Sequence, residues 1–252
     1  MVRRSAGGKV KIRWLFQGLS DLPPADDWLT EREAARMAGM AFPKRRGEFR
    51  LRRWTAKRAL GSVIGIRTDE LSRFEIGSAA DGAPASCLDG RPTPLSISLS
   101  DRAGWAVCVV ADGPAAVGCD LELVEPRSEA FIEDYLTASE RQLVKAANDE
   151  QQRYLLANLI WSAKESALKV LRTGLRRDTR SVEVSLSAAS EAECWSALRV
   201  GTRERTTIHG WWRRCGSFLL TTAADRPLSR PIALIDPPCL ADAVPRPERH
   251  ST

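Results

Sequence analysis

The feature that most constrains the fold of this chain is a long helical segment with apolar residues over much of its circumference. The segment runs from about Glu150 to Leu171, and Gly174 marks its end. Its apolar positions are Leu159, Ile160, Ala163, Ala167, Leu168 and Leu171. Because such a helix presents little polar surface to water, other elements must cover it. The sequence therefore predicts a helix that lies inside a folded core.

Strand patterns lie on both sides of this segment. Residues 105–110 are apolar, and residues 117–123 alternate, with Gly118, Asp120 and Glu122 on the face opposite the apolar one. Further short strand patterns follow the helix. We therefore expect an α+β fold.

The expected fold has two lobes and a tail. Residues 1–116 are expected to form a basic N-terminal lobe, and residues 117–228 a C-terminal lobe that contains the long helix. Residues 229–252 form a Pro-rich tail, and we expect its end to be disordered.

Two helices are expected in the N-terminal lobe. Thr30 and Glu33 have the spacing of a capping box, and Pro43 separates the helix they begin from a second one over residues 44–64. The candidate core residues of the second helix are Phe49, Trp54, Leu60, Val63 and Ile64. Residues 77–94 are rich in Gly, Pro, Ala and Asp and are expected to form a loop.

The composition excludes several classes of protein. No stretch approaches the ~18–20 apolar residues of a membrane-spanning helix, and the N-terminus lacks the apolar segment of a secretory signal. The six cysteines include no CxxC pair, and His209 and His250 are the only histidines, so neither a zinc site nor a histidine-based triad is expected. We expect a soluble, cytoplasmic protein with no membrane association.

Positive charge is concentrated in two segments. The chain has 38 Lys and Arg against 32 Asp and Glu, a net charge of +6. Residues 44–58 hold eight Lys or Arg and one Glu, and residues 172–180 hold four Arg and one Asp. Each segment is either a solvated face or a site for phosphates, nucleic acid or an acidic protein. Charge alone does not choose among these alternatives.

Two pairs of side chains have the spacing of a chemical site. Asp120 and Glu122 project from one face of a strand, where two adjacent carboxylates require a proton, a basic side chain or a hard metal ion such as Mg²⁺. Glu165 and Lys169 lie one turn apart on the long helix, with Trp161 on the same face. The second pair is either an ordinary ion pair or, if partly buried, a third metal-binding carboxylate and a base or phosphate clamp.

Three motifs combine these residues: Ser100-Asp101 before a strand, then Val117-Gly118-Cys119-Asp120-Leu121-Glu122, then Trp161 with Lys164-Glu165-Ser166 and Lys169. In this order and spacing they resemble the 4′-phosphopantetheinyl transferases of the larger, surfactin-activating type. The resemblance spans roughly residues 40–225. It implies two similar lobes related by a pseudo-two-fold axis, each a small antiparallel sheet packed with helices, in a monomeric chain.

The resemblance implies a site for coenzyme A and Mg²⁺, with Mn²⁺ as an alternative ion. Asp120, Glu122 and Glu165 match the metal ligands, and either Glu165 or Lys169 matches the base. The implied coenzyme A-binding residues are Arg46, Arg53, Arg58, Arg91, Ser100, Asp101, Lys164 and Lys169. The family's Gly-(Lys/Arg)-Pro motif has two candidates, Gly82-Ala83-Pro84, which lacks the cation, and Gly90-Arg91-Pro92, which keeps it.

The implied reaction transfers the phosphopantetheine of coenzyme A to a serine of an acyl or peptidyl carrier protein and releases adenosine 3′,5′-bisphosphate. Carriers of polyketide, nonribosomal peptide or fatty acid synthesis are typically acidic, which suits the basic segments. No nucleic-acid-binding motif accompanies the charge, so nucleic acid is not an expected partner.

Asp101 is the residue that departs from the family pattern, which has a histidine there. A carboxylate at that position repels the phosphates of coenzyme A unless Arg102 or another cation compensates. The alternative function is therefore a degenerate transferase fold that binds coenzyme A or a carrier protein without efficient transfer.

Overall fold

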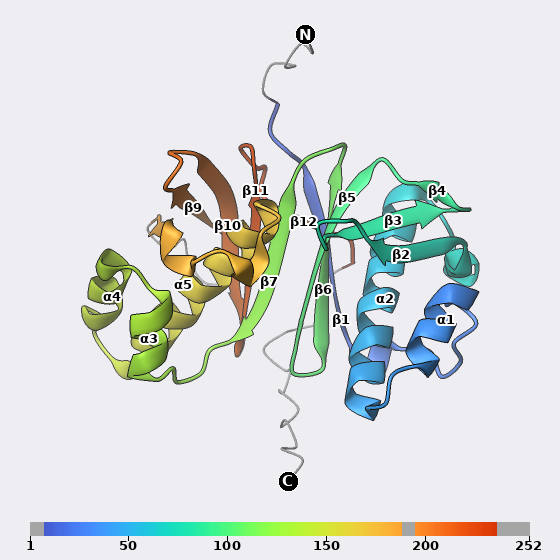
Figure 1. The fold of residues 1–252 in the computed structure, drawn as a ribbon, viewed down its shortest axis with the longest axis horizontal. Helices are drawn as coiled ribbons and strands as arrows, with labels where there is room; N and C mark the ends of the chain where they lie inside the picture. Colours follow the sequence, from blue (N-terminus) through green and yellow to red (C-terminus); the bar gives the residue numbers. More distant parts are fainter. Residues whose placement is uncertain (1–7, 188–194, 236–252) are drawn as a thin grey trace.

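Two β-sheets pack face to face at the centre of the molecule, and the helices cover their outer faces (Figure 1). The computed structural model describes residues 8–187 and 195–235. One sheet has the strand order β12-β1-β6-β5, a second has the order β7-β11-β10-β9-β8, and a third, smaller sheet has the order β2-β3-β4. All strand pairs are antiparallel except the parallel pair of β1 and β12, within the residues described.

The strands are β1 (Ile12–Gly18), β2 (Phe74–Ser78), β3 (Pro84–Leu88), β4 (Arg91–Pro92), β5 (Leu95–Arg102), β6 (Trp105–Asp112), β7 (Val117–Leu123), β8 (Val182–Leu186), β9 (Ser196–Thr202), β10 (Thr207–Cys215), β11 (Phe218–Ala224) and β12 (Ile232–Ala233). The α-helices are α1 (Glu31–Ala38), α2 (Pro43–Ile64), α3 (Glu129–Tyr135), α4 (Ala138–Lys145) and α5 (Glu150–Val170). Short 3-10 helices are η1 (Leu19–Asp21), η2 (Thr68–Arg73), η3 (Gly174–Arg176) and η4 (Thr179–Ser181).

Three apolar clusters hold these layers together. The central one lies between the two large sheets and includes Trp14, Phe16, Val109, Leu121 and Phe218. The second lies under α5 and the third under α2. The expected α+β class, with small antiparallel sheets packed with helices, is confirmed. No helix of the described residues is both long enough and apolar enough to cross a bilayer.

The predicted helices agree closely with the structure. The long helix is α5, and the capping box of Thr30 and Glu33 opens α1. α2 begins at Pro43 and buries Phe49, Trp54 and Leu60 as expected. The prediction for Ile64 is wrong, because this side chain is 39% exposed. Val63 is partly buried and packs against the apolar cluster under α2.

The expected loop over residues 77–94 is instead a small sheet. Its turns do lie at the glycines, since Gly82 and Gly90 have φ angles of 87° and 76°. Between the turns, however, Phe74 pairs with Leu88 and Ile76 pairs with Ser86. Composition identified the turns but not the strands, because each strand is only a few residues long.

The C-terminal segment returns to the N-terminal half of the molecule. Ile232 and Ala233 form β12, which pairs with Arg13 and Trp14 of β1. These residues belong to the segment expected to be a Pro-rich tail. The expected disorder concerns the end of that tail, which lies outside the described residues.

A buried ion pair fastens α1 to α2. The Glu33 side chain accepts hydrogen bonds from the backbone nitrogens of Thr30, at 3.1 Å, and Ile76, at 2.9 Å. Its Oε2 lies 2.5 Å from Nζ of Lys57, which is fully buried and also donates to the Trp28 carbonyl oxygen. One glutamate thus joins two helices and a strand.

The C-terminal half repeats this arrangement. Glu140 accepts from the backbone nitrogens of Thr137, at 2.7 Å, and Val184, at 2.8 Å, and lies 2.7 Å from Nζ of the fully buried Lys164. Lys164 follows Thr137 by 27 residues, the same separation as Thr30 and Lys57. In each half, a tryptophan of the long helix also makes an edge-to-face contact with another aromatic ring. Trp54 contacts Trp28 in this way, and Trp161 contacts Tyr135. The two halves therefore share one internal framework.

Candidate active site

A cluster of acidic side chains lies where β7 packs against α5. β7 directs Asp120 and Glu122 away from the central core, into which the alternate residues Cys119 and Leu121 are packed. Gly118 allows the strand to lie close to the helix, because a Cβ at this position would be 2.0 Å from the carbonyl oxygen of Ser166. The glycine of the motif thus brings the strand carboxylates to the helix that holds Glu165.

Asp120 lies at the centre of the cluster and is nearly buried. Its Oδ1 accepts hydrogen bonds from Ser100 Oγ at 2.9 Å and from Lys169 Nζ at 3.0 Å. Lys169 also donates to the Cys119 carbonyl oxygen at 2.8 Å. Burial of Lys169 is the largest single effect and disfavours its charged form, but Asp120, Cys119 and Glu165 together outweigh it, so the pKa of Lys169 is raised. Lys169 therefore remains charged at neutral pH.

Glu165 is the most perturbed carboxyl group of the cluster. Burial, and next the negative charge of Asp120, raise the pKa of Glu165 to about 7. Its Oε1 is enclosed and has no hydrogen-bond partner among the described residues, and the same is true of Asp120 Oδ2. Two carboxylate oxygens thus remain unsatisfied in one small region.

Glu122, by contrast, is well partnered. It accepts from Trp161 Nε1 at 3.0 Å and from Arg127 Nη2 at 3.1 Å, and Arg102 Nε lies 3.6 Å away. Burial and Asp120 nevertheless raise the pKa of Glu122. Arg127 was not among the residues predicted for this site, although adjacent carboxylates are expected to need a cation.

The cluster suits a hard divalent cation through two of its three carboxylates. Enclosed oxygens without a partner are costly, and Mg²⁺ commonly binds one or two carboxylates together with phosphates and water. Asp120 and Glu165 meet this requirement, whereas the oxygens of Glu122 are engaged by Trp161 and Arg127. No group of three or more His, Cys, Asp or Glu side chains within residues 8–187 and 195–235 is arranged as a ready metal centre.

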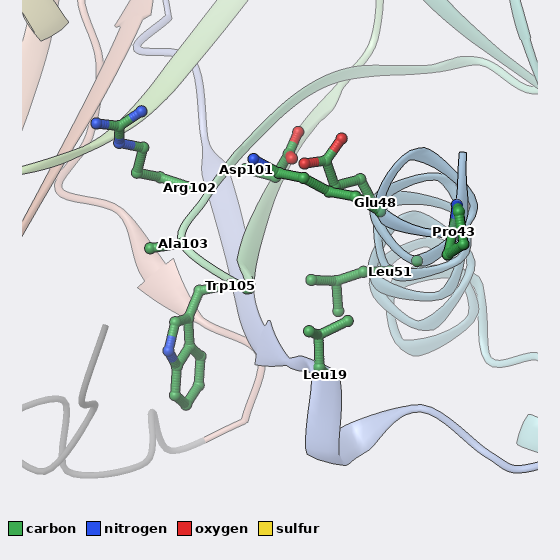
Figure 2. Close-up of a pocket in the computed structure, with 11 residues that line it drawn as sticks. Leu19, Pro43, Glu48, Leu51, Asp101, Arg102, Ala103 and Trp105 are labelled. Atoms are coloured by element: carbon green, nitrogen blue, oxygen red, sulfur yellow. The ribbon is translucent and has the colours of Figure 1, made fainter. Parts of the chain in front are cut away.

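Asp101 lies outside this cluster. It follows Ser100 on β5 and so points to the opposite face of the strand, where its Oδ1 accepts from Arg52 Nη1 at 2.7 Å. Figure 2 shows Asp101 and Glu48 at a cavity of about 380 Å³ between α2 and the turn that joins β5 to β6. The cation that compensates Asp101 is therefore Arg52, and Arg102 pairs instead with Glu125 at 2.7 Å.

The arginines predicted on α2 are not gathered at the acidic cluster. The coenzyme A-binding role of Arg53 stays a prediction; its guanidinium is buried over the Phe49 ring, and burial lowers its pKa to about 10. Arg46 donates to the Met40 carbonyl oxygen at 3.0 Å, and Arg58 lies over the Trp54 ring.

Two further predicted ligands lie elsewhere. The coenzyme A-binding role of Lys164 stays a prediction; in the structure this side chain is fully buried, pairs with Glu140 and donates to the carbonyl oxygens of Thr179 and Val182. Lys164 and Glu165 are adjacent on a helix and so point about 100° apart, one into the core and one to the site. Arg91 is exposed on the short strand β4 and is not brought to the cluster.

Comparisons with known proteins find similarity over parts of the chain. A curated relative, the 4′-phosphopantetheinyl transferase psf-1 of Bacillus pumilus, is 30% identical over 110 residues, which are 41% of this chain and 46% of that protein. The match thus spans less than half of the relative's length. A solved structure, the holo-[acyl-carrier-protein] synthase of Thermotoga maritima, covers 51% of this chain and 75% of its own, with 18% identity and a TM-score of 0.31.

A family model described as the 4′-phosphopantetheinyl transferase superfamily matches residues 116–221. The matched region contains β7 and α5, and with them Asp120, Glu122, Glu165 and Lys169. Residues 116–221, which hold the acidic cluster at the junction of β7 and α5, are thus similar in sequence to the 4′-phosphopantetheinyl transferase superfamily.

Proposed function

We propose that this protein transfers 4′-phosphopantetheine from coenzyme A to a serine hydroxyl of an acyl or peptidyl carrier protein in the presence of Mg²⁺. The observation that carries the proposal is the pair of enclosed, unpartnered oxygens of Asp120 and Glu165, next to the charged Lys169. This site lies within the segment that matches the superfamily. The relative from Bacillus pumilus, itself named a 4′-phosphopantetheinyl transferase, supports the same chemistry.

In the proposed reaction the serine oxygen attacks the β-phosphorus of coenzyme A. The bond from that phosphorus to the bridging oxygen of the diphosphate breaks, so the products are a phosphodiester and adenosine 3′,5′-bisphosphate. Asp120 and Glu165 would hold a Mg²⁺ ion, which would supply positive charge to the diphosphate. Lys169 supplies a second positive charge, which Asp120 holds in place at 3.0 Å.

The serine proton must be accepted by a nearby base, and Glu165 is favoured over Lys169. Burial and Asp120 raise the pKa of Glu165 to about 7 in the metal-free protein, and a bound Mg²⁺ would lower it, so that Glu165 would be deprotonated at neutral pH and able to accept the proton. Lys169 is a poor base, because Asp120 raises its pKa further. Glu122 adds negative charge beside the metal site, and Trp161 and Arg127 hold its carboxylate in place.

The proposal includes acidic carrier proteins as partners and a cytoplasmic location, where coenzyme A is available. Arginines on the exposed surface, such as Arg45 and Arg180, suit an acidic partner. The common framework of the two halves supports a single chain that works as a monomer. The degenerate alternative rested on Asp101, and the Arg52 partner of that residue removes the reason to prefer it.

The test is transfer to apo-carrier proteins of polyketide, nonribosomal peptide and fatty acid synthesis, followed by intact-mass spectrometry. We expect the mass of the phosphopantetheine arm to be added to at least one carrier, and to need Mg²⁺ or Mn²⁺. Asp120→Asn and Glu165→Gln should each slow transfer on the order of 100-fold, since each removes charge at the reacting phosphates. Asp112→Asn changes an exposed carboxylate far from the site and serves as the control. If no carrier is modified by the wild-type protein, the degenerate alternative holds.

A further inference from the structure

Three buried hydroxyl groups lie between α5 and the sheet that it covers, where the helix packs on β7 and β11 (Figure 1). They belong to Ser162 and Ser166 of α5 and to Thr221 of β11, and all three side chains are fully buried. Thr221 Oγ1 lies 2.9 Å from Ser162 Oγ and 2.7 Å from Ser166 Oγ. It also donates to the Ser162 carbonyl oxygen at 3.0 Å. Because its single proton is used in this way, Thr221 accepts a hydrogen bond from each serine hydroxyl.

Thr221 connects the two carboxylates of the acidic cluster. Within the sheet, Thr221 on β11 lies directly opposite Asp120 on β7. On the helix, its hydroxyl is bonded to Ser166, the residue after Glu165, and to Ser162, one turn earlier. A single side chain therefore joins the helix that holds Glu165 to the strand pair that holds Asp120.

The N-terminal half of the chain offers a comparison, because its buried lysine sets the alignment of the two long helices. In this alignment Thr55 occupies the position of Ser162. Its side chain is fully buried, but its hydroxyl donates to the Leu51 carbonyl oxygen of its own helix, at 2.8 Å. Ala59 occupies the position of Ser166. The buried hydroxyl of α2 thus serves its own helix rather than the sheet.

The same comparison relates the hydroxyls to the acidic cluster. β6, which α2 covers, directs Cys108 and Val110 into the apolar cluster under that helix. Arg58 stands where the C-terminal half has Glu165. A buried hydroxyl costs stability unless it is hydrogen-bonded, so apolar contacts are the simpler way to pack a helix on a sheet. The three joined hydroxyls occur in the half that holds the carboxylates, which indicates a role in placing them.

We propose that Thr221 is a positioning residue of the acidic cluster, which fixes Glu165 relative to Asp120 through its hydrogen bonds to α5. The inference rests on the proposed function, because it takes both carboxylates to bind one metal ion. Apolar packing leaves a helix free to slide and rotate slightly, whereas directional hydrogen bonds fix its position. A group that orients a metal ligand in this way affects metal affinity without touching the metal.

The test measures Mn²⁺ binding by the full chain, without coenzyme A or carrier protein, from the loss of the electron paramagnetic resonance signal of the free ion. Thr221→Val keeps the shape of the side chain and removes its hydroxyl. It should weaken Mn²⁺ binding about ten-fold, the lower end of the range for residues that orient metal ligands. Thr221→Ser keeps the hydroxyl and should restore binding. Ser166→Ala removes one of the bonds to Thr221 and should weaken binding by a smaller factor.

Thr55→Val is the matched control. It removes the corresponding buried hydroxyl of the N-terminal half, which serves only its own helix. This variant should lower the melting temperature by about as much as Thr221→Val while leaving the Mn²⁺ affinity unchanged. The comparison separates positioning of the cluster from a general loss of stability.

Wild-type Mn²⁺ affinity in Thr221→Val and Ser166→Ala would overturn the inference, as would an equal loss in Thr55→Val or no Mn²⁺ binding by the wild-type protein. Failure of Thr221→Ser to restore binding would overturn it too, because the methyl group rather than the hydroxyl would then matter.

Transfer to carrier proteins is measured separately. Where it occurs, Thr221→Val should lower kcat about ten-fold and leave the KM for coenzyme A nearly unchanged. If Mn²⁺ binding depends on Thr221 as predicted but no carrier is modified, the positioning role stands and the proposed function fails. If carriers are modified but Mn²⁺ affinity does not depend on Thr221, the proposed function stands and the positioning role fails.

Discussion

Replacing Lys164 by methionine separates a structural role from a role in coenzyme A binding. The Lys164 ammonium is fully buried and is held by Glu140 at 2.7 Å and by the carbonyl oxygens of Thr179 and Val182 at 2.9 Å each. Burial lowers the pKa of Lys164, but the Glu140 carboxylate opposes this shift. Methionine retains most of the volume and removes all three polar contacts, so packing changes little and the buried polar groups lose their partner.

The expected loss of stability is large. Removing one partner of a buried ion pair costs about 3–5 kcal/mol, because the other charge is left uncompensated. For a protein of this size the melting temperature falls by roughly 2–4 °C per kcal/mol, so we expect a decrease of roughly 10 °C. Lys57→Met breaks the equivalent pair of the N-terminal half and should have a similar effect. Lys145→Met, on the exposed surface of α4, is the control.

Thermal unfolding and transfer kinetics are measured on the same samples, with transfer well below the melting temperature. We expect the KM for coenzyme A to stay within about two-fold of wild type in Lys164→Met, since the ammonium faces the core. In a double-mutant cycle, Lys164→Met with Glu140→Gln should cost less than the sum of the single changes, by about 1–3 kcal/mol. A normal melting temperature with a strongly raised KM would refute the structural assignment of Lys164.

Three other predictions follow from the acidic cluster. In the presence of a metal chelator, Glu165→Gln should flatten the pH dependence of the free energy of unfolding. Between pH 4.5 and about 7 the folded wild-type protein retains a proton on Glu165 that the unfolded chain has lost. The free energy of unfolding of the wild-type protein therefore falls as the pH rises through this window, by up to about 3 kcal/mol. Chemical denaturation at several pH values checks this, and equal slopes for both proteins would contradict it. Glu122→Gln should weaken Mg²⁺ binding less than Asp120→Asn or Glu165→Gln, because Glu122 already accepts hydrogen bonds from Trp161 and Arg127. Calorimetric titration of each variant with Mg²⁺ measures the three affinities and gives their order. Gly118→Ala should destabilise the protein by about 1–3 kcal/mol and slow transfer, because the new methyl group must displace β7 from α5; unchanged stability would show that the two elements separate easily.

The local features of the chain were predictable because they depend on neighbours in the sequence. The capping box of Thr30 and Glu33, the start of α2 at Pro43 and the extent of α5 follow from caps, prolines and helical periodicity. The alternation over residues 117–123 placed Asp120 and Glu122 on one face of a strand. The short strands β2 and β3 were missed, since their stability comes from pairing with each other rather than from propensity.

The contacts between distant residues depend on the packing of whole elements, and the sequence does not contain them in readable form. Periodicity assigns Lys164 and Glu165 to different faces of α5. Only the packing of α4 and β7 against this helix decides that Lys164 forms a buried ion pair and that Glu165 joins the acidic cluster. The amino-acid sequence does not indicate which cation pairs with Asp101. The packing of α2 on β5 places Arg52, which is 49 residues away in the chain, within hydrogen-bond distance of it. Sequence by itself therefore indicated which side chains carry the proposed chemistry. The tertiary structure decided which charges they meet, because electrostatic partners are set by distance in space.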